Sequence, residues 1–373
     1  MKQKKIISIF GARPDTIKMA PLIHEISRHD EFENIVCTTA QHREMLDQML
    51  EVFKITPNYD LNIMQPRQTL IMIADKILVS LDEVLTKEKP DLVLVHGDTS
   101  TCFVSALTAF YHNVPIGHVE AGLRSGDINS PFPEEAHRML TGTIATLHFA
   151  PTKANAENLY KIGITKNVYV TGNTAIDALL SLVKEDYTFK SEALRNIDIT
   201  SKRTIAMTAH RHENLGKPLE NIFTAVKKLA TKYSNEIQII YPVHKNPVVM
   251  ECAEKILGGT DNIYLIDPVD VEDMHNLMRR SYFVMTDSGG LQEEAPSLGK
   301  PLLVFRTETE RPEAVDAGTV KIVGVETDNI YNEAVDLIEN KSAYLKMANA
   351  VNPYGDGKAS ERIVAGIKEY FGM

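Results

Sequence analysis

Cysteine is scarce in this 373-residue chain, and long apolar runs are absent from it. The three cysteines, Cys37, Cys102 and Cys252, are widely spaced, so the sequence contains no disulfide framework and no CxxC metal knuckle. No run approaches the roughly 18 apolar residues that a membrane-spanning helix requires. The apolar run from residue 6 to residue 10 is too short for the core of a signal peptide. We therefore expect a protein of a reducing compartment, the cytoplasm.

Several catalytic and cofactor fingerprints are missing as well. The segment Gly11-Ala12-Arg13-Pro14 does not supply the GxGxxG pattern of dinucleotide-binding folds, which disfavours a nicotinamide dehydrogenase. No GxSxG nucleophile elbow occurs. His210, His212 and Glu213 do not have the HExxH spacing of zinc enzymes, so proton transfer or phosphate contact suits these histidines better than metal binding. We expect neither a metal nor a cofactor.

Positive charge is in short supply, since 50 acidic residues face 40 basic ones and leave a net charge of -10. This balance works against non-specific binding to nucleic acid or to an anionic membrane, because both need a cationic face. Any anionic ligand must then be held by local groups. The composition, 43% hydrophobic and 24% charged, is that of a globular protein, and the length predicts about two domains.

Short apolar runs alternate with helical segments along the whole chain, and this order predicts repeated βα units and parallel sheets. The pattern pauses between residues 185 and 203 and then restarts. We therefore predict an α/β protein of two Rossmann-like, doubly wound domains, residues 1–170 and 171–355, with a last helix over residues 360–370. The strands are expected at residues 6–10, 35–38, 92–95, 114–119, 147–150, 168–170, 204–208, 237–241, 263–266, 282–285, 302–305 and 320–323.

Polar clusters follow nearly every apolar run. In the first half Arg13, Asp98 and Glu120 stand directly after predicted strands, and in the second half His210 and His244 do. In open parallel sheets ligands bind at the carboxyl ends of the strands. Polar caps of helices explain an isolated Asp or Ser there, but they explain so many His and Arg residues poorly. Two domains with facing strand ends would enclose one cleft.

Three acids in the first half are candidate catalytic groups. Glu120 ends a buried-looking strand, where a poorly solvated carboxyl is expected to have a raised pKa. Asp98 either caps the following helix or faces the ligand. Glu134 and Glu135 follow Pro133 and precede helical residues, so one of them could complement a helix start and the other act on a substrate.

A phosphate site is predicted around Asp287-Ser288-Gly289-Gly290, because glycines between a strand and a helix let an anion approach the backbone. The alternative is that Ser288 only caps the helix. Arg13 and Lys18, in and after the first strand-to-helix loop, could add positive charge to the same anion.

The ordered motifs resemble those of the non-hydrolysing bacterial UDP-N-acetylglucosamine 2-epimerases over about residues 6–324. The resemblance is carried by Gly11-Ala12-Arg13-Pro14, Ile17-Lys18-Met19-Ala20-Pro21, Gln41-His42-Arg43, His96-Gly97-Asp98-Thr99, His118-Val119-Glu120-Ala121-Gly122-Leu123-Arg124, Pro133-Glu134-Glu135, Thr171-Gly172-Asn173-Thr174, His210-Arg211, Pro242-Val243-His244, Asp287-Ser288-Gly289-Gly290 and Glu310-Arg311-Pro312-Glu313.

The resemblance implies a glycosyltransferase-B-like fold with the active site in the interdomain cleft and a final helix, residues 356–373, packed back on the first domain. It also implies interconversion of UDP-N-acetylglucosamine and UDP-N-acetylmannosamine by elimination and re-addition of UDP, through a 2-acetamidoglucal and without nicotinamide or metal. The product would serve the synthesis of surface polysaccharide precursors, and a homodimer is common in the family.

The resemblance also carries residue roles. The catalytic set comprises Asp98, Glu120, Glu134 and His210, with the face of C2 that each acid serves left open. The residues that hold UDP and the sugar are Arg13, Lys18, His244, Ser288, Gly289, Gly290, Glu294 and Arg311. A second, allosteric UDP-N-acetylglucosamine site in some relatives maps onto Gln41, His42, Arg67, Glu135, Arg211 and His244. The chain departs from the family pattern at Asp15, where relatives usually carry Glu, at His212, where Arg is common, and at Glu44, where some regulated members have Gln.

Three other functions remain open at this point. A hydrolysing relative would release UDP and free N-acetylmannosamine, but the intact Gln41-His42-Arg43 and Glu310-Arg311-Pro312-Glu313 favour the non-hydrolysing branch. A nucleotide-sugar binding protein would not need all the carboxylates. A glycosyltransferase of the same fold would not need an acid at Glu120.

Overall fold

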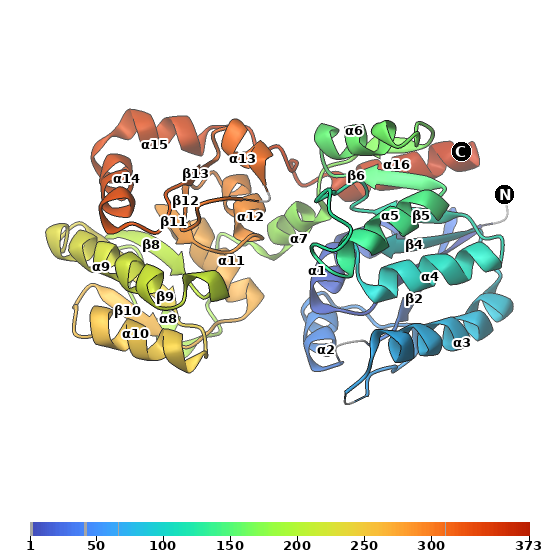
Figure 1. Cartoon of the computed structure of the whole chain (residues 1–373), viewed down its shortest axis with the longest axis horizontal. Helices are drawn as coiled ribbons and strands as arrows, with labels where there is room; N and C mark the ends of the chain where they lie inside the picture. Colours follow the sequence, from blue (N-terminus) through green and yellow to red (C-terminus); the bar gives the residue numbers. More distant parts are fainter. Residues whose placement is uncertain (1–2, 41–42, 66, 310) are drawn as a thin grey trace. The chain divides into compact units, whose positions relative to one another are not determined.

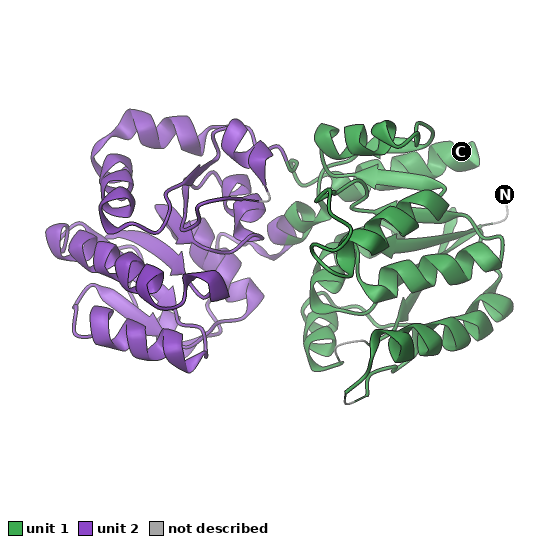
Figure 2. Ribbon diagram, in the orientation of Figure 1, with its two compact units in different colours: residues 1–178, 354–373 green, residues 179–353 purple. Residues whose placement is uncertain are grey.

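The chain forms two compact units, each described here by itself. The structure is a computed structural model that describes residues 3–40, 43–65, 67–309 and 311–373. One unit comprises Met1–Ala178 with Tyr354–Met373, and the other comprises Leu179–Pro353 (Figure 2). The boundary predicted between residues 170 and 171 lies before helix α7 (Thr174–Leu182), whereas the two units meet within that helix.

The first unit is built on a seven-stranded, wholly parallel sheet in the order β3-β2-β1-β4-β5-β6-β7 (Figure 1). Except at the two edges, the strands are rich in Ile, Val and Leu and are largely buried, as expected for a parallel sheet between helices. They are β1 (Lys4–Phe10), β2 (Phe32–Thr38), β3 (Tyr59–Asp60), β4 (Leu92–His96), β5 (Ile116–Val119), β6 (Leu147–Ala150) and β7 (Val168–Val170).

Helices connect these strands and cover the sheet. Besides α7, the helices of this unit are α1 (Arg13–Ile26), α2 (Arg43–Val52), α3 (Leu70–Glu88), α4 (Ser100–Tyr111), α5 (Glu134–Ile144), α6 (Lys153–Lys161) and α16 (Ala359–Phe371). Helix α4 packs between α3 and α5, and α1 packs against α2 and α16. The core under α3 and α4 is formed by apolar side chains such as Ile7, Ile77 and Val95.

The last helix is held in the first unit by specific contacts. The carboxylate of Asp177 in α7 accepts the backbone N–H groups of Ala359 and Ser360 at 3.1 and 2.7 Å, and so satisfies the first turn of α16. Near the other end Lys368 forms an ion pair with Glu31 at 2.6 Å.

The second unit repeats the pattern with a six-stranded parallel sheet in the order β10-β9-β8-β11-β12-β13. Its strands are β8 (Arg203–Thr208), β9 (Ile237–Pro242), β10 (Ile263–Ile266), β11 (Phe283–Thr286), β12 (Leu302–Val304) and β13 (Val320–Ile322). Its helices are α8 (Glu192–Arg195), η1 (His212–Asn214), α9 (Lys217–Lys232), α10 (Pro247–Leu257), α11 (Val271–Arg280), α12 (Leu291–Ser297), α13 (Pro312–Asp316), α14 (Thr327–Glu339) and α15 (Lys341–Ala348).

The predicted pair of doubly wound α/β folds is confirmed. Each predicted strand corresponds to a strand of the structure, with ends that differ by a few residues at most. The sequence analysis missed β3, a two-residue edge strand that is too short to produce a recognisable apolar run. It also missed the four-residue helix α8 in the stretch where the pattern pauses. Within the described ranges, no helix combines the length and apolar character needed to cross a membrane.

Both sheets reverse their strand order at one place, between β1 and β4 in the first unit and between β8 and β11 in the second. The loops that leave the carboxyl ends of neighbouring strands diverge at such a reversal and leave room for a ligand. Arg13 and Asp98 follow β1 and β4, and His210 and Asp287 follow β8 and β11. The candidate residues therefore gather where this fold binds ligands.

Candidate active site

Glu120 is the centre of the polar cluster in the first unit. It follows β5 directly and has a φ of 65°, a left-handed conformation that is uncommon for a residue with a side chain. Its carboxylate is in an ion pair with Lys18 of α1 and accepts a hydrogen bond from the amide of Asn173 at 3.1 Å. Strained backbone that is retained by surrounding contacts is typical of functional sites.

His96, the last residue of β4, lies beside the same carboxylate. Its Nε2 is 3.6 Å from Oε2 of Glu120, and its Nδ1 is 3.4 Å from Oδ1 of Asp15 in α1. Only 3% of the imidazole is exposed. Burial works against a charge on His96, but the two carboxylates outweigh it and raise the pKa of His96 to about 9.

The expectation of a raised pKa for Glu120 is wrong. Burial does favour the protonated form, but the positive charges of Lys18 and His96 hold the pKa of Glu120 well below its usual range. The sequence argument treated Glu120 as an isolated buried acid, whereas the fold places two cations against it. Glu120 is therefore a carboxylate at neutral pH.

Asp98 is held differently. Its Oδ2 accepts hydrogen bonds from the guanidinium of Arg138, with Nε at 2.8 Å and Nη2 at 2.6 Å. The N-cap of α4 is Thr99, so Asp98 does not serve as the helix cap. Burial raises the pKa of Asp98 despite Arg138, and the charge of Glu120 adds to the rise. The two carboxyls are shifted in opposite directions.

Glu134 and Glu135 both lie in the first turn of α5, but their surroundings differ. Glu135 is buried and accepts hydrogen bonds from Arg138 and from the backbone of Ser125, both at 3.1 Å. Oε2 of Glu134 is buried without a hydrogen-bond partner among the described residues. Of the two, Glu134 thus has the oxygen left over for a ligand, while Glu135 supports Arg138.

In the second unit the buried carboxylate of Asp287 organises the loop after β8. Its Oδ2 accepts the backbone N–H groups of His210 and Arg211, both at 2.8 Å, and the side-chain amide of Asn214 at 3.2 Å. The register of β8 and β11 pairs Thr208 with Thr286, which brings the two loops together.

His210 stacks on His244, with ring centroids 5.1 Å apart and planes 11° apart. Burial and the positive surroundings lower the pKa of His210, although Asp287 acts in the opposite direction. The ring is therefore neutral at pH 7 and able to exchange a proton. Among the described residues, no three His, Cys, Asp or Glu side chains are grouped as a metal site would require.

Two guanidinium groups flank Gly289. A Cβ atom at this position would lie 3.3 Å from Nη2 of Arg211 and 3.3 Å from Nη1 of Arg311. The N-cap of α12 is Gly290, so the interpretation of Ser288 as a side-chain cap is wrong. In Glu294, the predicted ribose-binding residue, Oε2 lies 3.2 Å from Nε2 of the buried His275. Backbone and guanidinium groups thus supply the local positive field that the net charge of the chain conceals.

The residues predicted for a second ligand site are only partly described. Gln41 and His42 lie outside the described residues, as does Glu310 of the Glu310-Arg311-Pro312-Glu313 motif. Arg67 is exposed with a φ of 59°, and Arg211 lies 4.0 Å from Glu213.

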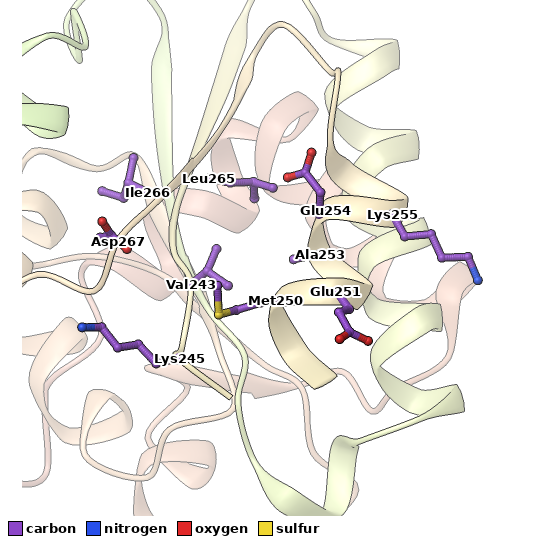
Figure 3. Close-up of a pocket in the computed structure, with 10 residues that line it drawn as sticks. All are labelled: Val243, Lys245, Met250, Glu251, Ala253, Glu254, Lys255, Leu265, Ile266 and Asp267. Carbon is purple, nitrogen blue, oxygen red and sulfur yellow. The ribbon is translucent and has the colours of Figure 1, made fainter. Parts of the chain in front are cut away.

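The second unit contains a cavity of about 740 Å³, whose lining includes Val243 and Lys245 on either side of His244 in the sequence (Figure 3). It opens between the ends of β9 and β10 and helix α10, with an apolar floor that includes Val243 and Leu265 and a rim of charged side chains that includes Lys245 and Asp267. None of the predicted catalytic or UDP-holding residues lines it.

Sequence reasoning assigned no role to His96, Asp15, Arg138, Asn173 and Asp287 themselves. His96, Asn173 and Asp287 stood within quoted motifs, but only the topology reveals that they contact the predicted groups. A signal was present in His96 and Asp287, since each is a polar residue at the end of a buried strand.

Comparison with known proteins shows the family of the chain. The family model described as UDP-N-acetylglucosamine 2-epimerase matches residues 24–368. The UDP-N-acetylglucosamine 2-epimerase of Bacillus subtilis is 51% identical, over 100% of this chain and 97% of that protein. The enzyme of Escherichia coli K12 is 49% identical, over 98% of both chains. The crystal structure of UDP-GlcNAc 2-epimerase from Neisseria meningitidis bound to UDP-GlcNAc is 48% identical with a TM-score of 0.84, over 98% of this chain and 100% of that one. This chain belongs to the UDP-N-acetylglucosamine 2-epimerase family.

Proposed function

We propose that the protein interconverts UDP-N-acetylglucosamine and UDP-N-acetylmannosamine without hydrolysis. The proton at C2 of the sugar is not acidic, so it is removed as the C1–O bond to UDP breaks. The products of this step are UDP and a 2-acetamidoglucal with a C1=C2 double bond. UDP then re-adds to C1 while C2 takes a proton on its other face, so atoms and charge balance without a cofactor.

The observation that carries this proposal is the pair of carboxyls with opposite shifts in the first unit. Glu120 is ionised at neutral pH and so has the form that can accept a proton, and the raised pKa of Asp98 favours the protonated form that an acid needs. Glu134, with a buried oxygen that has no partner among the described residues, is the third acid–base group. We propose that His210, neutral at pH 7, exchanges the proton of the departing or returning phosphate.

The leaving UDP needs positive groups, because it departs as an anion. We propose that the backbone of Ser288, Gly289 and Gly290 and the guanidinium of Arg311 bind the pyrophosphate, and that Arg13 and Lys18 also contribute positive charge to UDP binding. His244 adds to this set through its stack on His210, and Glu294 accepts the ribose hydroxyls. The N. meningitidis relative, solved with UDP-GlcNAc, supports the choice of ligand.

One experiment tests the reaction and separates it from the alternatives. The protein is incubated with UDP-N-acetylglucosamine in deuterated water, and the sugar is followed by NMR. A UDP-linked gluco and manno mixture with deuterium at C2 supports the proposal. Free N-acetylmannosamine would indicate the hydrolysing reaction instead, and an unlabelled, unchanged substrate would leave only a binding protein or a glycosyltransferase.

We also propose a homodimer, which rests on the resemblance and on apolar side chains exposed on α3. Ile71 and Val79 are 80% and 60% exposed in the single chain, and exposed apolar patches mark interfaces. The I71E variant should reduce the mass measured by light scattering to that of one chain. Val351, 83% exposed in the second unit, offers the control V351E, which should keep the wild-type mass. A monomeric wild type would contradict the dimer.

A further inference from the structure

The imidazole of His96 lies between two carboxylates that come from different elements. Asp15 belongs to α1 and Glu120 follows β5, and each has an oxygen within 3.6 Å of a different ring nitrogen. The other oxygen of Asp15 accepts the hydroxyl of Thr99 at 3.3 Å, which fixes the Asp15 side chain from the far side. Neither ring nitrogen makes a hydrogen bond with the described residues, so the two carboxylates contact the ring as ion-pair partners.

This arrangement favours the charged form of the ring. A neutral imidazole has one N–H and one lone pair, so one of its nitrogens would present a lone pair to a carboxylate oxygen. The imidazolium has two N–H donors, one for each acceptor. With Lys18 on the same carboxylate, the four groups then sum to zero charge in a buried place, where an uncompensated charge is costly.

Burial alone does not produce such a histidine in this sheet. His118 on the neighbouring strand β5 and His148 on the next strand β6 are as deeply buried, but no carboxylate of the described residues pairs with them, and burial lowers their pKa values to about 3 and about 4. Nε2 of His118 instead lies 2.8 Å from the backbone oxygen of Gly97. The two carboxylates are what distinguish His96.

We propose that His96, protonated and held by Asp15, is a positioning residue that orients Glu120 and keeps it ionised when Lys18 turns to the pyrophosphate of the substrate. The inference rests on the proposed function, which gives Lys18 that second partner. Lys18 is 20% exposed and can reach a ligand, whereas His96 is almost fully enclosed and stays on Glu120. It touches no reacting atom and acts through Glu120.

The first test reads the charge directly and does not depend on activity. In ¹⁵N-histidine-labelled wild type at pH 7.5, the His96 signal, assigned by its loss in His96→Asn, should have the shift of an imidazolium. In Asp15→Asn the apparent pKa of that signal should fall. A neutral His96 in the wild type would overturn the proposal whether or not the protein is an epimerase.

The second test measures the kinetics of C2 exchange. His96→Asn should lower kcat at least tenfold while the Kd for UDP changes less than threefold, and Asp15→Asn should lower kcat less. The titratable groups that interact with His96 are Asp15 and Lys18 from α1, Asp98 after β4, His118 of β5 and Glu120. Loss of one cation from this set raises the pKa of Glu120, so the acid limb of the pH profile should move upward.

His148→Asn is the matched control, because it removes an equally buried imidazole that faces no carboxylate. It should lower Tm and leave the acid limb in place. A His96→Asn protein with wild-type kcat and acid limb would refute the role, and so would an equal loss of UDP affinity and kcat. Absence of exchange in the wild type would instead reject the proposed reaction, and the imidazolium measurement would still decide the charge of His96.

Discussion

At the scale of single residues, two carboxyls at adjacent strand ends are driven in opposite directions by what surrounds them. Lys18 and His96 depress the pKa of Glu120, whereas burial raises that of Asp98 although Arg138 contacts it. One sheet edge thus holds an ionised carboxylate and a carboxyl whose protonated form is favoured, the pair that the proposed acid–base reaction needs.

The carboxamide variants E120Q and D98N test the proposed roles of Glu120 as a base and of Asp98 as an acid. Each keeps the shape of its side chain but cannot transfer a proton, so C2 exchange should fall by about 10²- to 10⁴-fold, the usual contribution of such a group. The Kd for UDP should change little, because positive groups and not these acids hold the nucleotide. The exposed Glu157 on α6 provides the control E157Q, which should be as active as wild type. Wild-type exchange in both acid variants would contradict the assignment.

The buried histidines also predict how stability depends on pH. The pKa values of His118 and His148 are about 3 and about 4 in the folded chain, against about 6.5 when unfolded. Between the folded and unfolded pKa values the unfolded state binds more protons than the folded state. The contribution of these two histidines to the free energy of unfolding is therefore fully present above pH 6.5 and is lost as the pH falls below it. For each histidine, the free energy of unfolding should fall by up to about 1.4 kcal/mol per pH unit as the pH is lowered through this window. Chemical denaturation at pH 7 and pH 5 should therefore show a smaller loss of stability in His148→Asn than in wild type, and an equal loss would contradict the linkage.

At the scale of elements, the loop after β8 takes its conformation from a side chain on another strand. Asp287, directly after β11, accepts three hydrogen bonds from that loop and thereby sets the positions of His210 and Arg211. Hydrogen bonds to a charged acceptor contribute about 1.5 to 3 kcal/mol each, so this one residue fixes the loop.

Asp287→Ala should release the loop, lower Tm and weaken UDP binding by at least tenfold. Asp287→Asn, which keeps an acceptor oxygen, should fall between this variant and wild type. The control is Asp198→Ala in the same unit, because Asp198 also accepts a backbone N–H, that of Thr200, but lies in an exposed turn outside the site. UDP affinity is measured by calorimetry, and equal losses in Asp287→Ala and Asp198→Ala would show that the β8 loop needs no such support.

How much of the fold and of the candidate site can be predicted from the sequence depends on whether a feature is local or joins distant residues. Buried parallel strands are recognisable in the sequence as apolar runs, and the polar residues that follow them indicate the edge of the sheet where ligands bind. Asp98, Glu120 and His210 could therefore be selected from the sequence. The contacts of His96 with Asp15, or of Asp287 with His210, join residues about 80 positions apart in the chain. Only the folded chain brings such residues together. The contacts of Lys18 and His96 with Glu120 are of the same kind, and for this reason the direction predicted from the sequence for the pKa of Glu120 was wrong.

At the scale of the whole molecule, the chain passes between the two units twice, once within α7 and once between Pro353 and Tyr354. The final segment therefore completes the unit that the N-terminal half begins. In α16, Ile363, Val364 and Ile367 are buried, and the helix packs on α1 and β7. The stability of the first unit thus depends on residues that come last in the sequence.

Truncation after Pro353 should destabilise the first unit selectively. Burying three aliphatic side chains contributes about 1.5 to 3 kcal/mol each, so their loss is on the order of 5 kcal/mol or more, comparable with the whole stability of many domains. The carboxylate of Asp177 would also lose its two backbone donors. Hydrogen exchange should show reduced protection in α1 and β7 but native protection in β8 and β11. Truncation after Phe371, which removes only the exposed Gly372 and Met373, should leave both sheets protected. If the truncation after Pro353 reduced protection equally in both sheets, the two units would share one cooperative transition and α16 would not belong to the first unit alone.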